Sequence, residues 1–100
     1  MIKHIKSEEE FNNLIKEGKV VVDFFANWCG PCRMLSPIIE EVSNENENIT
    51  FLKVDIDEVE LIPKKYGIMS IPTLLVFENG ELIKRETGYL GKEELNSFIK

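Results

Sequence analysis

Two cysteines, Cys29 and Cys32, are the residues whose type and spacing could do chemistry in this chain. They stand three positions apart in the segment Ala-Asn-Trp-Cys-Gly-Pro-Cys, between an apolar run and a segment with helical periodicity. A thiolate is the nucleophile in thiol–disulfide exchange, and the dipole and free N–H groups at a helix N-terminus stabilise an anion. We therefore predict that the pKa of Cys29 lies below that of free cysteine. Cys29, held on an exposed lip, would attack a substrate disulfide, and Cys32, nearer the core, would resolve the mixed disulfide.

Other uses of a close cysteine pair fit the sequence less well. A structural zinc site needs four ligands, and besides the two cysteines the chain offers only the distant His4. We assign no catalytic role to His4. An iron–sulfur cluster commonly needs four cysteines, and a c-type haem needs histidine where Arg33 stands. A purely structural disulfide would close too short a loop to restrict the unfolded chain much. We therefore favour redox catalysis without a metal or other cofactor over these alternatives.

Composition bounds the class of protein. The chain has 100 residues, a net charge of −6, 43% hydrophobic residues and 30% charged residues, which predicts one domain over residues 1–100. Its scattered lysines and arginines argue against nucleic acid and against an anionic membrane surface as partners. No apolar stretch approaches the ~20 residues that span a bilayer, and the N-terminus lacks a signal region. We therefore expect a cytoplasmic monomer.

The first half of the chain reads as alternating strands and helices. Residues 1–6 predict an edge strand, and Ser7 with Glu10 forms a capping box for a helix that Gly18 ends. Residues 20–26 form an apolar run without alternation, which indicates a central strand buried on both faces. A helix should begin near Cys29, with a kink at Pro37, and the polar residues 43–48 should form its exit loop.

The second half adds a hairpin. Residues 49–56 predict a strand, after which Asp57 would cap a short helix that Pro63 interrupts and Gly67 closes. Asn79-Gly80 between two strand-like runs is typical of a tight β-turn, and a final helix follows. These elements predict an α/β fold: a central mixed β-sheet, with parallel strands plus a C-terminal antiparallel hairpin, flanked by helices on both faces. The acidic residues 55–60 indicate a solvated face rather than a calcium site.

The Trp-Cys-Gly-Pro-Cys run resembles the active-site motif of the thioredoxin family, and the resemblance extends over the whole chain. It implies the thioredoxin fold, reduction of disulfides in target proteins and re-reduction by a thioredoxin reductase. The chain departs from the family pattern at Phe25, where many members have a second tryptophan, and at Asn27. Further matches occur in the family's order at Val22-Asp23-Phe24, Pro37, Lys53-Val54-Asp55, Ile71-Pro72-Thr73 and Gly88.

Two charged residues lie in apolar surroundings. Asp23 interrupts the run Val-Val-Val-Asp-Phe-Phe, where burial should raise its pKa, although an aspartate bonded to backbone at a strand end would look the same. The resemblance implies a buried carboxylate that assists proton transfer to or from Cys32. Lys53 reads by itself as a solvated strand residue, whereas the resemblance implies that it neighbours Asp23 and tunes it.

The resemblance also implies a docking surface and a cis peptide bond between Ile71 and Pro72. Each residue of this surface could instead serve only packing or turn geometry. Two other functions stay open: an oxidant or isomerase on the same fold, and a binding module without redox turnover. The predicted docking patch consists of Trp28, Gly30, Pro31, Ile71, Pro72 and Gly88.

Overall fold

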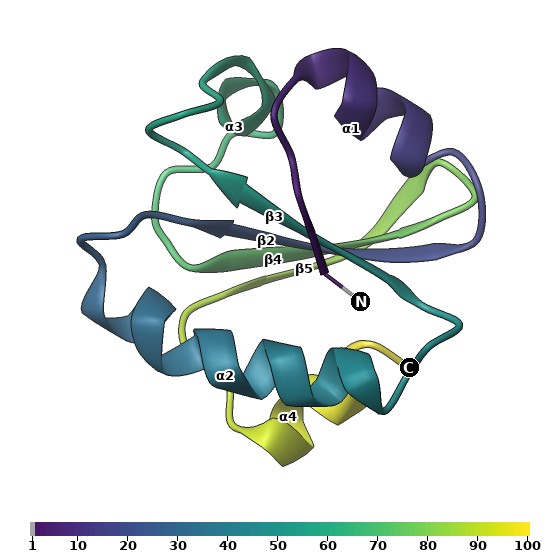
Figure 1. Cartoon of the computed structure of the whole chain (residues 1–100), viewed down its shortest axis with the longest axis vertical. Helices are drawn as coiled ribbons and strands as arrows, with labels where there is room; N and C mark the ends of the chain where they lie inside the picture. Colours follow the sequence, from purple (N-terminus) through teal and green to yellow (C-terminus); the bar gives the residue numbers. More distant parts are fainter. Residues whose placement is uncertain (1) are drawn as a thin grey trace.

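A five-stranded sheet with helices on both faces forms the framework of the computed structural model, which describes residues 2–100 (Figure 1). The strands lie in the order β1-β3-β2-β4-β5, so the first strand is at an edge as predicted. β1, β3 and β2 pair in parallel, and β4 and β5 run antiparallel. The elements are β1 (Ile2–His4), α1 (Glu8–Leu14), β2 (Lys19–Phe25), α2 (Gly30–Asn44), β3 (Thr50–Asp55), α3 (Leu61–Lys65), β4 (Thr73–Glu78), β5 (Glu81–Thr87) and α4 (Lys92–Phe98).

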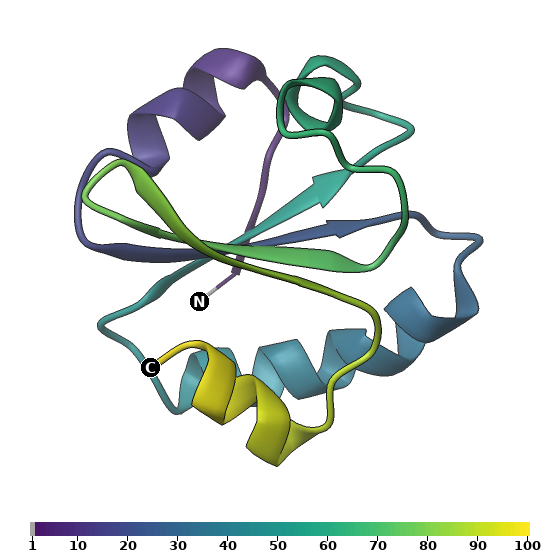
Figure 2. The ribbon, with the colours of Figure 1, turned by 180° about the vertical axis from the view of Figure 1, so that it is seen from behind.

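Two helical layers cover the sheet. Figure 1 shows α1 and α3 above one face and α2 and α4 below the other, and Figure 2 shows the same layers from behind. Because the connections between the parallel strands need crossovers, the helices end up on the faces of the sheet. The predicted fold class, a mixed sheet with parallel strands and a C-terminal hairpin between helices, is confirmed. No helix among residues 2–100 is long and apolar enough to cross a membrane.

The central strand β2 explains the apolar run that precedes the cysteines. It lies between β3 and β4, and successive side chains point to opposite faces. Val20, Val22 and Phe24 pack in the cluster under α1 and α3, whereas Val21 packs in the cluster against α2 and α4. The alternation therefore places Asp23 on the α2 face of the sheet. The structure therefore confirms the prediction that this strand is buried on both faces.

Two helix predictions are wrong in detail. α1 ends at Leu14, not at Gly18, because the chain turns so that Gly18 exchanges two hydrogen bonds with Asn79 of the hairpin, at 2.8 and 2.9 Å. Asp57 does not cap α3, which begins at Leu61. Pro63 does not interrupt α3 but occupies its first turn, where a backbone N–H would have no partner within the helix.

Other local predictions agree with the structure more closely. Ser7 caps α1 by accepting a hydrogen bond from the Glu10 amide at 3.1 Å. The hairpin turn has positive φ at Asn79 (49°) and at Gly80 (89°), the conformation that a tight hairpin turn requires. α2 begins after Cys29 as predicted, and it continues through Pro37 to Asn44, so the predicted exit loop is shorter than residues 43–48. The kink at Pro37 stays a prediction.

Candidate active site

The two cysteines lie at the start of α2, after the short connection that follows β2. Cys29 is the N-cap residue, with extended backbone, and Cys32 is in the first turn. The two residues form a disulfide, with their Cα atoms 5.2 Å apart. The backbone N–H of Cys32 donates to Cys29 Sγ at 3.2 Å. This amide is one of the N–H groups that a helix leaves without an intrahelical partner, so it is available to a sulfur anion at the N-cap.

Both cysteines are buried, which corrects the expectation of an exposed lip for Cys29. The exposed fraction is 6% for Cys29 and 2% for Cys32, so only the order of exposure agrees with the prediction. Cys29 is covered because the pair packs with Ala26 and the partly buried Ile71. The carbonyl oxygen of Ile71 lies 3.8 Å from Cys29 Sγ.

The Ile71–Pro72 segment lies against the cysteines from across the sheet. Its peptide bond is cis, which is the geometry that the resemblance implies. The amide of Gly88 donates to the Pro72 carbonyl at 2.8 Å, and Gly88 has a φ of 105° that glycine adopts readily. Gly88 thus has a clear local role in holding the segment. Within residues 2–100, the backbone of Ile71 forms no hydrogen bond with another backbone group.

Trp28 is an exposed member of the predicted docking patch. Its side chain is 67% exposed, and its indole N–H donates to the Asp57 carboxylate at 2.8 Å. Asp57 therefore positions Trp28, whereas the local sequence pattern predicts a helix cap at Asp57. Gly30 and Pro31 are exposed beside Cys29 at the start of α2.

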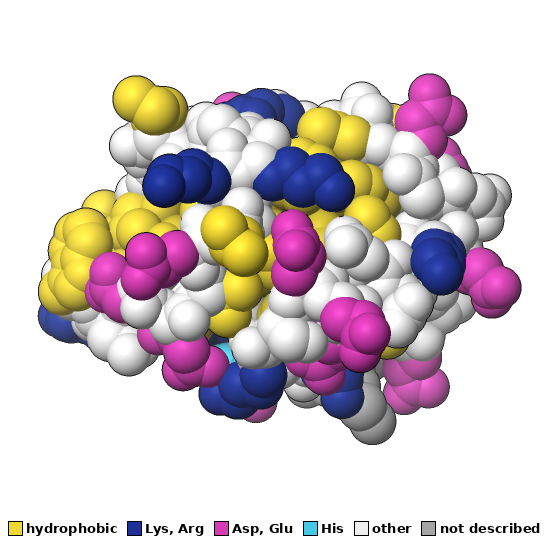
Figure 3. Space-filling model, turned by 90° about the horizontal axis from the view of Figure 1, so that it is seen from above, with side chains coloured by type: hydrophobic (Ala, Val, Ile, Leu, Met, Phe, Trp, Pro, Cys, Tyr) yellow, Lys and Arg dark blue, Asp and Glu magenta, His cyan; other side chains and the backbone are white. Residues whose placement is uncertain are grey.

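The surface on the α1 and α3 side of the molecule carries charges of both signs. Figure 3, which views this side, shows basic and acidic side chains interspersed.

Asp23 is a buried carboxylate without a hydrogen bond. It is 2% exposed, and neither side-chain oxygen has a partner among residues 2–100, which excludes the alternative of an aspartate bonded to backbone. Burial raises the pKa of Asp23 from 3.8 to about 6, and the positive charge of Lys53 opposes the rise. The ammonium nitrogen of Lys53 lies 3.8 Å from Asp23 Oδ2, close enough for a strong charge interaction but too far for a hydrogen bond.

Lys53 is not the solvated residue that its strand position alone indicates. It is 7% exposed and is the register partner of Asp23 on the neighbouring parallel strand. Its ammonium group donates to Ser36 Oγ at 3.0 Å and lies 4.5 Å from the centre of the Phe25 ring. Ser36 escaped the sequence analysis, although its spacing of four residues from Cys32 places the two on the same helix face.

The remaining polar candidates lie away from the cysteines. His4 is exposed on β1 and packs edge-on to Phe25, with ring centres 6.4 Å apart. Among residues 2–100, no group of three histidine, cysteine, aspartate or glutamate side chains is placed to hold a metal ion. The structure thus brings together Cys29, Cys32 and Ile71, and separately joins Asp23 to Lys53 on the sheet face below α2.

Comparisons with known proteins agree over nearly the whole chain. The Thioredoxin family model matches residues 2–100. The chain is 44% identical to the thioredoxin of Mycoplasmoides gallisepticum, over 99% of this chain and 100% of that protein. It is also 44% identical to the thioredoxin of Listeria monocytogenes, over 99% of this chain and 96% of that protein. The solved structure of Plasmodium falciparum thioredoxin is similar with a TM-score of 0.92 and 39% identity, covering 97% of this chain and 95% of that chain.

Proposed function

Because the chain belongs to the thioredoxin family of disulfide oxidoreductases, we propose that it reduces disulfides in target proteins through its Cys-Gly-Pro-Cys pair. A thioredoxin reductase would then reduce the Cys29–Cys32 disulfide again. The observation that carries the proposal is the Cys32 amide, which is directed at Cys29 Sγ from the first turn of α2. A helix N-terminus that donates to this sulfur favours its anionic form, the form that attacks disulfides. We place the activity in the cytoplasm, where thiols are kept reduced.

The exchange proceeds in two balanced steps. The Cys29 thiolate attacks one sulfur of the target disulfide, and the other target sulfur leaves as a thiolate and takes up a proton. Cys32 then loses its proton and attacks Cys29 Sγ, which breaks the mixed disulfide and releases the second target sulfur. Two electrons pass from the Cys29–Cys32 dithiol to the target, which becomes a dithiol. The close approach of the two residues, with Cα atoms 5.2 Å apart, suits the second step.

Asp23 is the group that we propose to accept the proton of Cys32. A pKa of about 6 leaves most of this carboxylate ionised at neutral pH while keeping it basic enough to take a proton. A hollow of about 80 Å³ is lined by Cys32, Ser36 and Lys53, so it offers room for water between the Cys32 sulfur and the Lys53 ammonium group. The charge of Lys53 keeps the pKa of Asp23 from rising further, which is the tuning role that we propose for Lys53.

The target would dock on the apolar surface around Cys29. Trp28, Gly30 and Pro31 lie exposed beside Cys29 at the start of α2. The partly buried Ile71, whose carbonyl oxygen lies against Cys29 Sγ, the buried Pro72 and the partly buried Gly88 would complete the docking surface. The Ile71 backbone groups are available to pair with an extended segment of the target, as an added strand does. This arrangement would direct a target disulfide toward Cys29 rather than toward the more buried Cys32.

A covalent trap separates the two sulfurs. The Cys32→Ser variant should accumulate a mixed disulfide with a substrate such as insulin, because the second step is blocked. The matched Cys29→Ser variant should trap little, and equal trapping would contradict the assigned roles. The unaltered chain should reduce insulin with dithiothreitol as electron source and then with an NADPH-linked reductase. A strongly oxidising reduction potential would favour an oxidant, and full biological activity of a Cys29→Ser/Cys32→Ser variant would favour a binding module.

A further inference from the structure

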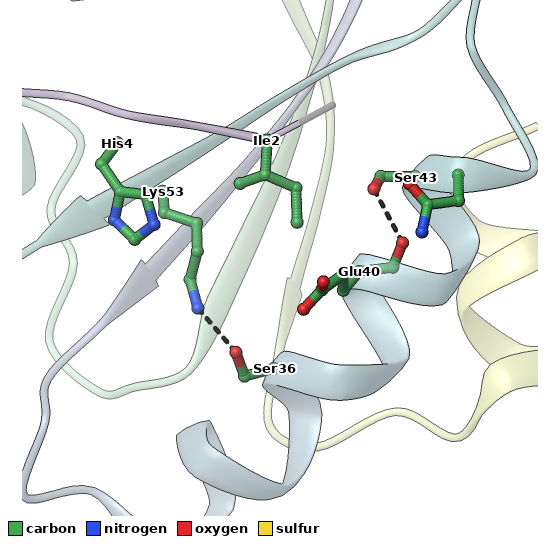
Figure 4. A pocket seen from close by; sticks show the side chains of 7 residues that line it. Ile2, His4, Ser36, Glu40, Ser43 and Lys53 are labelled. Carbon is green, nitrogen blue, oxygen red and sulfur yellow. Dashed lines mark hydrogen bonds between the residues drawn. The ribbon is translucent and has the colours of Figure 1, made fainter.

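The hydroxyl group of Ser36 is the one acceptor that holds the Lys53 ammonium by a hydrogen bond among residues 2–100. Figure 4 shows Lys53 reaching from its strand across to Ser36 on α2, with the hydrogen bond drawn as a dashed line. The Nζ–Oγ distance is 3.0 Å, whereas the Nζ–Oδ2 distance to Asp23 is 3.8 Å. The charge of Asp23 therefore attracts the Lys53 ammonium group, whereas the hydrogen bond to Ser36 fixes its position.

We propose that Ser36 is a positioning residue of the redox site: its hydroxyl holds the Lys53 ammonium beside Asp23 and thereby sets how readily Asp23 takes a proton. The inference rests on the proposed function, because it concerns the proton acceptor of the second exchange step. Ser36 touches neither sulfur in the proposed reaction and acts only through Lys53. Its place on α2, one turn after Cys32, couples the position of the ammonium to the helix that carries the cysteines.

The surroundings show where the ammonium would go without Ser36. A groove of about 340 Å³ opens beside Lys53 between β1 and α2, and His4, Ser36 and Glu40 line it. A buried ammonium that loses its acceptor is costly, whereas this groove offers water and the Glu40 carboxylate. The long side chain of Lys53 can swing into the groove by rotation of its stem. Removal of the Ser36 hydroxyl should therefore move the positive charge away from Asp23.

The charged groups around this pair come from three stretches of the chain, residues 4–6, 32–40 and 55–58. On the β4 side, the register partner of Asp23 is the apolar Leu74, so no charge faces it from that strand. The exposed charged groups near this pair are in contact with water and therefore act on Asp23 more weakly than the buried Lys53 does. The titratable and charged side chains that line the hollows next to Lys53 are His4, Lys6, Cys32, Arg33, Glu40, Asp55 and Glu58.

The loss of the nearby ammonium would make the charged form of Asp23 less stable. A displacement of Nζ from 3.8 Å to roughly 6 Å, at an effective dielectric constant of about 20, raises the pKa of Asp23 by about one unit. The midpoint of the acid limb of the pH–rate profile for disulfide reduction should therefore shift to higher pH by the same amount. At pH 6 the ionised fraction would fall from about one half to about one tenth, so turnover should be about fivefold slower.

The test is a carboxyl-carbon NMR titration of Asp23 in the oxidised chain, with and without Ser36→Ala. We expect the midpoint to rise by about one unit in Ser36→Ala and to stay in place in Ser36→Thr, which keeps the hydroxyl. The matched control is Ser43→Ala, which removes a second hydroxyl, itself buried, from α2 beside the same groove. Ser43 donates to the Glu40 carbonyl and does not contact Lys53, so Asp23 should titrate as in the unaltered chain.

Three results would overturn the inference. One is an unchanged Asp23 midpoint in Ser36→Ala, and another is a lowered midpoint, which would mean that Ser36 holds the ammonium away from Asp23. The third is an equal rise when Ser36→Ala is added to Lys53→Met, because the effect would then not act through Lys53. The titration does not depend on turnover. A chain that reduces insulin but shows no shift refutes this inference alone, whereas a shift without insulin reduction refutes the proposed function alone.

Discussion

Replacing the buried carboxylate of Asp23 by alanine should remove a pH-dependent destabilisation of the fold. The pKa of this group is raised from 3.8 to about 6 in the folded chain, so the folded state binds the proton more tightly than the unfolded state does. The penalty is therefore absent below pH 3.8, grows as the pH rises toward 6 and is fully present above 6. A rise of about two units corresponds to about 3 kcal/mol at neutral pH.

The Asp23→Ala variant lacks this penalty but leaves Lys53 without its counter-charge. The charge interaction between Asp23 and Lys53 is already contained in this penalty, because it opposes the rise in the pKa of Asp23. We therefore expect the free energy of unfolding of the variant, relative to the unaltered chain, to increase by about 2–3 kcal/mol from pH 4 to pH 7. At neutral pH the stability should rise or hold, while disulfide reduction slows because Cys32 has lost its proton acceptor.

The assay is urea unfolding of the oxidised chain at several pH values, followed by circular dichroism and by the emission of Trp28, the single tryptophan. The slope of free energy against urea must agree between variants for the comparison to hold. Glu47→Ala, which removes an exposed carboxylate from the loop between α2 and β3, is the control. If Asp23→Ala gave a curve parallel to that of the unaltered chain, as expected for Glu47→Ala, the argument from burial would be wrong.

Substitutions at three further residues test the packing and the hydrogen bonds. Phe11→Ala should cost about 3–5 kcal/mol in urea unfolding, because this fully buried ring packs edge-on against Phe77, and a loss below about 1 kcal/mol would count against that core. Ser7→Ala should cost about 1 kcal/mol and Ser7→Asp much less, since Ser7 caps α1; equal losses would show that the cap does not matter. Asp57→Ala should lower the fluorescence anisotropy of Trp28 by freeing its indole, while Asp57→Asn keeps an acceptor; no difference between the two would contradict the hydrogen bond.

The features that local pattern determines were predictable from the sequence. The apolar run of β2 indicates a strand covered on both faces, and the Asn79-Gly80 pair indicates the hairpin, because each depends on residues next to one another. The position of Cys29 at the start of α2 follows from the same kind of signal, a helical pattern with proline in its first turn. The family resemblance added what periodicity could not, which was the proximity of Lys53 and Asp23.

The features that were missed depend on contacts between distant segments. Asp57 pairs with the indole of Trp28 across 29 positions of the sequence, and the local pattern instead indicated a helix cap. Ser36 meets Lys53 only because α2 packs over the sheet face on which the lysine stands. The burial of Cys29 likewise comes from a segment of the chain more than 40 residues away, at Ile71. Such contacts are set by strand register and helix packing, which no short segment of the sequence specifies.

The proposed reaction depends on a thiolate at Cys29 that the N-terminus of α2 stabilises. Its most direct test is the rate of alkylation by iodoacetamide across a pH series, measured on the reduced Cys32→Ser variant so that Cys29 alone reacts. We expect a half-maximal rate at a pH below the pKa of about 8.5 that free cysteine shows. A profile that coincides with that of free cysteine in solution would contradict it.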